Sequence, residues 1–468
     1  MNSITDILDL VDLDIEIADI QINGRQKILT LQTPPAVHFC PLCNFRMHSR
    51  GLKTRTINHP VLQDGYSLVL KLRQRRWRCS NPLCGYTANE EFNFVDKHKR
   101  NTNATDMLII NAFRDLSASA VSIAEKFGVS DTYALETFDK YVKLERLPLT
   151  DIISVDEVHL DLDPFCKYAL IIQDFYTGDP IDLLQSRRST STEPYFTSIP
   201  MEERRNVKYL ISDMYNPYIN YVDKYFPNAV SVVDSFHVIQ WINHSIEMYI
   251  RNLTKKYKQR DRENYEQQWH PEVMPAYIPQ SREVYLLQKF RWLILSNQSN
   301  ITYHNELRRD KHLNCLMNTY DYEDALFQID PNLRELRDLK ELYITFNTRN
   351  AGHPMDARLD LDELISVYLQ SSNPIFIDFA DLLIRFHDYI LNSFVMAERH
   401  GSGKIYDSRL SNGPIESINR KVKDLKRAGR GYRNFEHFRS RFLFAARRNP
   451  VITGSSNSHP VSYYQNED

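Results

Sequence analysis

The sequence predicts a multidomain α+β protein, and three observations lead to this prediction. Two closely spaced cysteine pairs stand near the start of the 468-residue chain. From about residue 150 the pattern changes to short apolar runs that are typical of strands. A long stretch from about residue 236 to 400 then reads as helical, with no clear strand. The length alone is that of roughly three domains.

The cysteine pairs predict a metal-binding ribbon. The four residues are Cys40, Cys43, Cys79 and Cys84. Two residues separate the first pair, four separate the second, and the segment 66–73 between them alternates apolar and polar residues as a strand does. Two cysteine knuckles joined by strands describe a zinc ribbon with a closed tetrahedral thiolate site, and unrelated buried thiols are the alternative. Cys166 and Cys315 stand alone and are expected to be core residues.

The segments that flank the ribbon are expected to be short elements. Residues 1–37 predict an acidic amphipathic helix followed by strands at 20–22 and 27–30. Residues 119–134 have the pattern of a helix-turn-helix, in which Ser130 is a natural N-cap for the second helix. That second helix starts with an acid, Asp131, so a purely structural helical hairpin is as good an interpretation as a DNA reader.

The region after residue 150 predicts a mixed sheet. Five strands are expected, at 152–158, 167–173, 181–185, 207–212 and 229–233, with helical segments near 193–199 and 215–226. The first three strands follow one another closely, as in an antiparallel meander, and a crossover helix separates the last two. That order matches an RNase H-like α/β/α core. The tail from residue 451 is expected to be disordered.

Three carboxylates are candidate metal ligands, and two of them come at the ends of apolar runs of the predicted sheet. Asp156 ends the apolar run 152–155, Asp213 ends the run 207–212, and Glu416 lies in a helical stretch beyond the long helical region. Such groups are costly to bury unless they are paired or bind a cation, and together they predict a Mg²⁺ or Mn²⁺ site, with two ions in a phosphoryl-transfer enzyme. The alternatives are Glu157 as the ligand in place of Asp156, a helix cap at Asp213, and an ion pair of Glu416 with Arg420.

Composition and charge point to a DNA-binding protein of the cytoplasm. No apolar run approaches the ~20 residues of a membrane span, the start lacks a secretory signal, and six cysteines are too few for a disulfide scaffold. The net charge is −2, yet residues 40–78 carry nine basic residues against one acid and residues 420–448 carry eleven against two. Such segregation favours two basic faces that bind a phosphate backbone, with solvated surface charge as the alternative.

The motifs, taken together, resemble the ISL3 family of bacterial insertion-sequence transposases of the DDE type. The matching pieces are the cysteine ribbon, the helix-turn-helix, and the segments 155–157, 212–218, 226–237 and 412–432. The resemblance implies an RNase H-like core interrupted by an all-helical insertion, with Asp156, Asp213 and Glu416 as the catalytic triad. The expected domains are the ribbon at 1–100, the helix-turn-helix at 101–148, the core at 149–250 and 406–450, and the insertion at 251–405.

The expected function is binding of terminal inverted repeats, followed by metal-dependent strand cleavage and transfer on double-stranded DNA, by a dimer or larger assembly. A nuclease or resolvase on the same fold, and a non-catalytic DNA-binding regulator, are the alternatives. Asp234 and His237 are possible accessory site residues. The DNA-contact residues expected from the basic clusters are Arg73, Arg75, Arg76, Trp77, Arg78, Arg420, Lys423, Lys426, Arg427 and Arg430.

Overall fold

The computed structural model describes most of the chain. The described residues are 15–63, 66–268, 278–401, 403–429 and 431–450. The acidic helix predicted before residue 15, the tail from residue 451 and the predicted DNA contact Arg430 lie outside them. Among the described residues, none of the helices combines the length and apolar character that a membrane span requires.

The chain divides into two compact units that both contain strands and helices, which confirms the multidomain α+β class. We call them the ribbon unit and the sheet unit. The ribbon unit comprises residues 1–146, 158–169 and 418–468, and the sheet unit comprises residues 147–157 and 170–417. The three predicted catalytic carboxylates all belong to the sheet unit.

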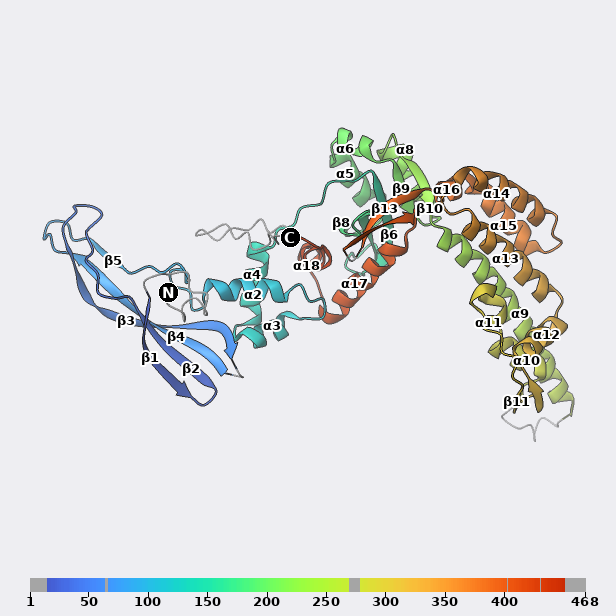
Figure 1. The fold of residues 1–468 in the computed structure, drawn as a ribbon, viewed down its shortest axis with the longest axis horizontal. Helices are drawn as coiled ribbons and strands as arrows, with labels where there is room; N and C mark the ends of the chain where they lie inside the picture. Colours follow the sequence, from blue (N-terminus) through green and yellow to red (C-terminus); the bar gives the residue numbers. More distant parts are fainter. Residues whose placement is uncertain (1–14, 64–65, 269–277, 402, 430, 451–468) are drawn as a thin grey trace. The chain divides into compact units, whose positions relative to one another are not determined.

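A five-stranded sheet forms the start of the ribbon unit (Figure 1). Its strands are β1 (Glu16–Asn23), β2 (Gln26–Gln32), β3 (Met47–Gln63), β4 (Tyr66–Cys79) and β5 (Thr87–Asn89). The order is β1-β2-β4-β3, with β5 paired to β4, and β2 and β4 run parallel. The strands predicted at 20–22, 27–30 and 66–73 are confirmed, since they lie within β1, β2 and β4. They form here because alternate apolar residues such as Leu70 and Leu72 are buried on one face.

The two helices and the glycine-containing turn predicted within residues 119–134 are also confirmed. Helix α3 (Ala120–Phe127) ends at Gly128, whose positive φ of 65° suits a residue without a side chain, and Ser130 caps α4 (Asp131–Tyr141) by accepting the Tyr133 backbone N–H. The preceding helix, α2 (Asn103–Ala112), and the last helix of the chain, α18 (Phe435–Ala446), complete this helical group. Phe138 of α4 packs edge-on against Phe444 of α18, with ring centroids 5.7 Å apart.

The sheet unit contains the mixed sheet that the sequence predicts. Its strands are β6 (Ile152–His159), β7 (Tyr168–Asp174), β8 (Pro180–Leu184), β9 (Tyr209–Ser212) and β10 (Val230–Val233), in the order β10-β9-β6-β7-β8. The hairpin of β7 and β8 is antiparallel, whereas β9 pairs in parallel with both β6 and β10. The helices α5 (Ser189–Ser198) and α6 (Met201–Asn206) connect β8 to β9. The crossover between the last two strands consists of α7 (Asn216–Ile219) and α8 (Tyr221–Tyr225).

A helical region follows β10, as predicted (Figure 1). Its helices are α9 (Ser235–Gln268), α10 (Arg282–Lys289), α11 (Trp292–Leu295), α12 (Thr319–Ile329), α13 (Asn332–Arg349), α14 (Pro354–Leu369), α15 (Pro374–Arg385) and α16 (His387–Asn392). They share one apolar core, in which every fourth residue of α9 from Val238 to Ile250 is buried. Helix α17 (Gly413–Gly429) then carries Glu416.

The prediction that this region contains no strand is wrong, because two short hairpins interrupt the helices. They are β11 (Arg308–Asp310) with β12 (Cys315–Met317), and β13 (Met396–Gly401) with β14 (Lys404–Arg409). The first is held by a buried polar group rather than by apolar alternation: the Asp310 carboxylate accepts the hydroxyls of Tyr285 and Tyr322 at 2.6 and 2.9 Å. Hydrophobic periodicity cannot reveal such a hairpin.

Candidate active site

Three aspartates follow the register of the parallel strands. Tyr209 of β9 pairs with Ile152 of β6 on one side and with Val230 of β10 on the other. Four residues further along the three chain segments stand Asp156, Asp213 and Asp234. Because parallel strands keep their register, these residues occupy neighbouring positions at the carboxyl end of the sheet. The sheet order therefore brings two of the three predicted catalytic residues together, with Asp234 beside them.

Strand alternation places these aspartates on one face of the sheet. Ile152, Ile211 and Val232, which lie an even number of residues before them, belong to one buried cluster that also contains Leu410. The intervening positions, such as Val155, face a second cluster on the other side of the sheet. Leu410 comes shortly before α17, so the face that carries the aspartates is also the face that the Glu416 segment covers.

Glu157 lies on the opposite face from Asp156, as strand alternation predicts. Its Oε2 atom accepts a hydrogen bond from the Tyr218 hydroxyl at 2.9 Å and forms an ion pair with Arg187. Tyr218 is fully buried among the residues of the second cluster. Glu157 is therefore engaged by residues of α7 and of the segment before α5, and Asp156 remains the better candidate for the metal ligand.

Asn412 fixes the start of the helix that carries Glu416. Its side chain is 1% exposed, and its Nδ2 donates to the carbonyl oxygen of Val155 at 3.3 Å. Its backbone N–H hydrogen-bonds to the Asp234 carboxylate. One polar residue therefore ties α17 to the strand of Asp156 and to the end of β10. Glu416 follows one helical turn later, in the first turn of α17, and its side chain is half-buried.

Burial acts strongly on two of the acids. Burial raises the pKa of Asp213, although the Tyr215 backbone N–H and the nearby His237 and Arg187 act in the opposite direction. Burial likewise raises the pKa of Asp234, which is 2% exposed. A raised carboxyl pKa means that the folded chain disfavours the negative charge, so a cation that binds the ionised form would relieve that cost.

The fold places Asp156 and Asp213 at neighbouring positions and ties the start of the Glu416 helix to the same sheet, but it does not by itself cluster the three side chains. Among the described residues, the carboxylate oxygens of Asp156, Asp213 and Glu416 are not drawn together within 4.8 Å, whereas the four cysteine sulfurs are. Oxygen ligands from carboxylates are nevertheless the donor set that Mg²⁺ takes. That Asp156, Asp213 and Glu416 bind a metal together therefore stays a prediction, and it concerns the metal-bound state of the chain.

Asp234 acts as a cap for two helices. Its Oδ1 accepts the Phe236 N–H of α9 at 3.3 Å, and the carboxylate also binds the Asn412 N–H before α17. We expect Asp234→Ala to lower the free energy of unfolding by about 1–3 kcal/mol, because buried N–H groups lose their acceptor.

Urea denaturation of this variant checks the expectation. Asp223→Ala on the exposed side of α8 is the matched control and should change stability by less than about 0.5 kcal/mol. Equal stability of the Asp234 variant and the unmodified chain would contradict the capping role.

The four cysteines of the predicted ribbon come together at metal-binding distances. Cys40 Sγ lies 3.7 Å from Cys84 Sγ, and Cys43 Sγ lies 3.4 Å from Cys79 Sγ. A tetrahedral site with Zn–S bonds of about 2.3 Å requires sulfur–sulfur distances of about 3.8 Å. All four are free thiols, so this donor set fits a structural zinc ion.

The two knuckles have matching backbone geometry despite their different lengths. The Cys40 N–H donates to Phe45 O and the Cys79 N–H donates to Tyr86 O, at 2.8 and 2.9 Å. Each knuckle also turns through a left-handed residue just after its second cysteine, Asn44 in one and Gly85 in the other. The longer second spacing therefore adds two residues to the loop without changing how the loop closes.

The predicted DNA-contact residues fall into two groups. Those with exposed side chains are Arg73, Arg76 and Arg78 of β4 and Arg420, Lys423 and Arg427 of α17, and Lys426 is half-buried. Arg75 instead donates to Thr33 O and contacts Glu90, and Trp77 is 7% exposed among the cysteines. Trp77 is therefore part of the ribbon core rather than an exposed groove contact. The exposed charged side chains of α4 are three acids, Asp131, Glu136 and Asp139, and one base, Lys140.

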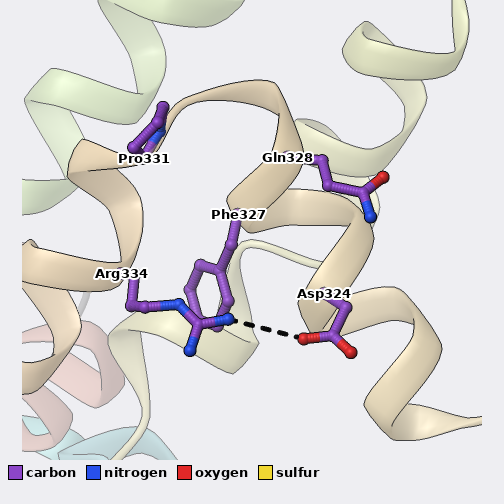
Figure 2. Close-up of a pocket in the computed structure, with 5 residues that line it drawn as sticks. All are labelled: Asp324, Phe327, Gln328, Pro331 and Arg334. Carbon is purple, nitrogen blue, oxygen red and sulfur yellow. Dashed lines mark ion pairs between the residues drawn. The ribbon is translucent and has the colours of Figure 1, made fainter.

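The helical region holds a small surface cavity of about 230 Å³ between α12 and α13 (Figure 2). Figure 2 shows Arg334 over the Phe327 ring, with its guanidinium 3.6 Å from the Asp324 carboxylate. The polar groups that line the cavity thus bind one another, and the volume is below the roughly 300–1,000 Å³ of ligand pockets. We therefore do not assign a binding site to this cavity.

Comparison with known proteins places the chain among the transposases. The family model described as "Transposase" matches residues 153–442, from β6 into α18, and the matched segment includes the whole helical region. Because the match covers more than half of the chain, the chain belongs to the ISL3 family of transposases. The chain is also similar to the transposase for insertion sequence element IS1001 of Bordetella parapertussis, with 22% identity over 426 residues, 89% of this chain and 90% of that protein.

Proposed function

We propose that this chain is a DDE transposase that binds the terminal inverted repeats of its insertion sequence and carries out divalent-metal-dependent strand cleavage and strand transfer. The observation that carries the proposal is the shared register of Asp156 and Asp213, together with the anchoring of the Glu416 helix to the same sheet by Asn412. The sheet order, with β6 in the centre and the β7–β8 hairpin beside it, supports an RNase H-like core.

The three carboxylates would hold two Mg²⁺ or Mn²⁺ ions, with Asp156 between Asp213 and Glu416. Bound there, the ions supply activation of the attacking oxygen and stabilisation of the leaving oxygen. The chain's own part is to fix the carboxylates at the sheet edge and to hold the DNA in line, because positioning and charge neutralisation dominate phosphoryl transfer. Burial raises the pKa values of Asp213 and Asp234, and His237 lies close enough to both to offset part of that effect, so it remains an accessory candidate.

DNA binding is assigned to the ribbon and to α17. A zinc ion held by the four thiolates would stiffen the end of the β3–β4 pair, from which the arginines of β4 project. The basic side chains of α17 follow Glu416 along the same helix, so one element would join the catalytic carboxylate to the phosphate backbone. The acidic solvent-facing side of α4 makes this helix a poor phosphate binder. Synapsis of two ends implies at least a dimer.

The proposal is tested with the purified chain and a duplex that carries the DNA flanking its coding region. We expect Mg²⁺-dependent nicking at the element's end, followed by joining of the new 3′ end to a target plasmid. Nicking without joining would favour a nuclease or resolvase of the same fold. Binding with no metal-dependent cleavage would favour a DNA-binding regulator.

A further inference from the structure

Arg187 lies at the same end of the sheet's strands as the candidate carboxylates. The Phe175 N–H donates to Ile152 O, so the end of β7 meets the start of β6 and the two strands are antiparallel. Strand β8 is antiparallel to β7 and therefore runs in the direction of β6. The segment after β8, which contains Arg187, consequently emerges at the end of the sheet where β9 ends and where Asp156 of β6 and Asp213 stand.

Several contacts hold the guanidinium of Arg187 in a fixed place. Its Nη1 binds Glu157 Oε2, which also accepts the Tyr218 hydroxyl. Its central carbon lies 5.2 Å from the centre of the Tyr215 ring, two residues after Asp213. Burial raises the pKa of Asp213, and the positive charge of Arg187 lies close enough to offset a small part of that effect. The Arg187 side chain is 29% exposed, so the guanidinium is oriented by protein groups and still reaches solvent beside the site.

These contacts orient the Arg187 guanidinium so that it can bind a phosphate. A guanidinium is a planar fork with five N–H donors, and it can bind a carboxylate along one side and a phosphate along another. The guanidinium lies over the Tyr215 ring, and the bond to Glu157 fixes the direction of the fork. A preorganised cation beside the reacting phosphate costs no reorganisation when the DNA end arrives, and this is the arrangement that stabilises charge in phosphoryl transfer.

We propose that Arg187 is a further DNA-binding residue of this site, which contacts a backbone phosphate next to the scissile bond, and that Glu157 and Tyr218 are the positioning residues that orient it. The inference rests on the proposed function, since it needs a DNA end bound over the carboxylates. The competing explanation is an ion pair that serves stability alone. The pair of Lys208 and Asp151, with 3.2 Å between nitrogen and oxygen, is such a pair at the opposite edge of the sheet, just before β9 and β6.

The salt dependence of DNA binding separates the two explanations. Affinity for the flanking-DNA duplex is measured between 50 and 200 mM salt, with Ca²⁺ in place of Mg²⁺. For each phosphate contact that is lost, the slope of log affinity against log salt falls by about 0.9. We expect Arg187→Gln to reduce the slope by about that amount, whereas Lys208→Gln, the matched control, leaves the slope unchanged. Arg187→Lys should restore the slope, because it restores the charge.

Cleavage rates with saturating DNA test the positioning residues. Although Arg187→Lys restores the slope, it should cleave roughly a hundredfold more slowly than the unmodified chain, because a lysine lacks the oriented fork. Glu157→Gln should keep the binding slope yet slow cleavage by roughly tenfold, and it provides the test if the Arg187 variants fail to fold. An unchanged slope in folded Arg187→Gln, or full cleavage by Glu157→Gln, would overturn the inference while leaving the transposase proposal intact. If the unmodified chain neither binds nor cleaves the duplex, both proposals fall.

Discussion

Replacement of any one of the three carboxylates is expected to reduce Mg²⁺-dependent cleavage by at least about a thousandfold. Asp156→Asn, Asp213→Asn and Glu416→Gln each remove a negative oxygen ligand while keeping the size of the side chain. Loss of metal-assisted charge stabilisation is worth several kcal/mol, and about 4 kcal/mol corresponds to a thousandfold in rate. Single-turnover cleavage of a labelled end duplex measures the effect. The control is Asp223→Asn, an exposed acid on α8 of the same unit, which should cleave at the rate of the unmodified chain.

Asp213→Asn carries a second expectation that separates catalysis from folding. Because burial raises the pKa of Asp213, its ionised form destabilises the metal-free fold above that pKa, and a neutral asparagine removes the cost. The metal-free variant should therefore unfold at a temperature no lower than that of the unmodified chain. Addition of Mg²⁺ should stabilise the unmodified chain and not the variant. A variant that is inactive because it is unfolded would contradict this expectation.

Loss of the zinc ion proposed for the ribbon is expected to weaken DNA-end binding by at least a hundredfold. Cys79 is buried among the other three cysteines, and structural zinc contributes on the order of 10 kcal/mol or more to the folding of such small sites. Cys79→Ser should lower the zinc content from one per chain to well below one, open the ribbon to proteolysis, and reduce end binding by at least a hundredfold. Metal analysis, limited digestion and a binding assay check the three effects.

Cys315→Ser is the matched control for the zinc site, because Cys315 is an exposed free thiol on β12. The prediction that Cys166 and Cys315 are core residues is wrong, since Cys315 is exposed and Cys166 is only half-buried. This variant should keep its zinc and its affinity for DNA. The zinc assignment would be contradicted if the unmodified native chain bound less than one zinc and all four ribbon thiols reacted freely. It would also be contradicted if Cys79→Ser bound DNA as tightly as the unmodified chain.

Local sequence patterns were sufficient to predict the main elements. The five strands of the mixed sheet follow from apolar runs, and the helix-turn-helix follows from Ser130 and Gly128, because each depends on residues that are close in sequence. The cysteine spacings predicted the four-sulfur cluster for the same reason. The hairpin around Asp310 was not predicted, because a buried polar network stabilises it and its sequence does not alternate between apolar and polar residues.

The supporting residues of the site could not be predicted from the sequence, because their roles depend on long-range pairing. Asn412 is bonded to Val155, 257 positions away, and only its place just before a glycine and a proline at a helix start gave a local signal. Arg187 becomes a site residue only once the direction of β8 is known, and no local motif marks it. Trp77 illustrates the opposite case: its arginine neighbours indicated DNA contact, yet the cysteine cluster buries its ring.

Anomalous diffraction from crystals that contain Mn²⁺ and an end duplex is the measurement that decides whether the helix after the insertion completes a metal site. We predict manganese peaks within coordination distance of carboxylate oxygens of Asp156, Asp213 and Glu416. Manganese bound by other residues, with Glu416 outside coordination distance while the DNA end is in place, would contradict the assignment.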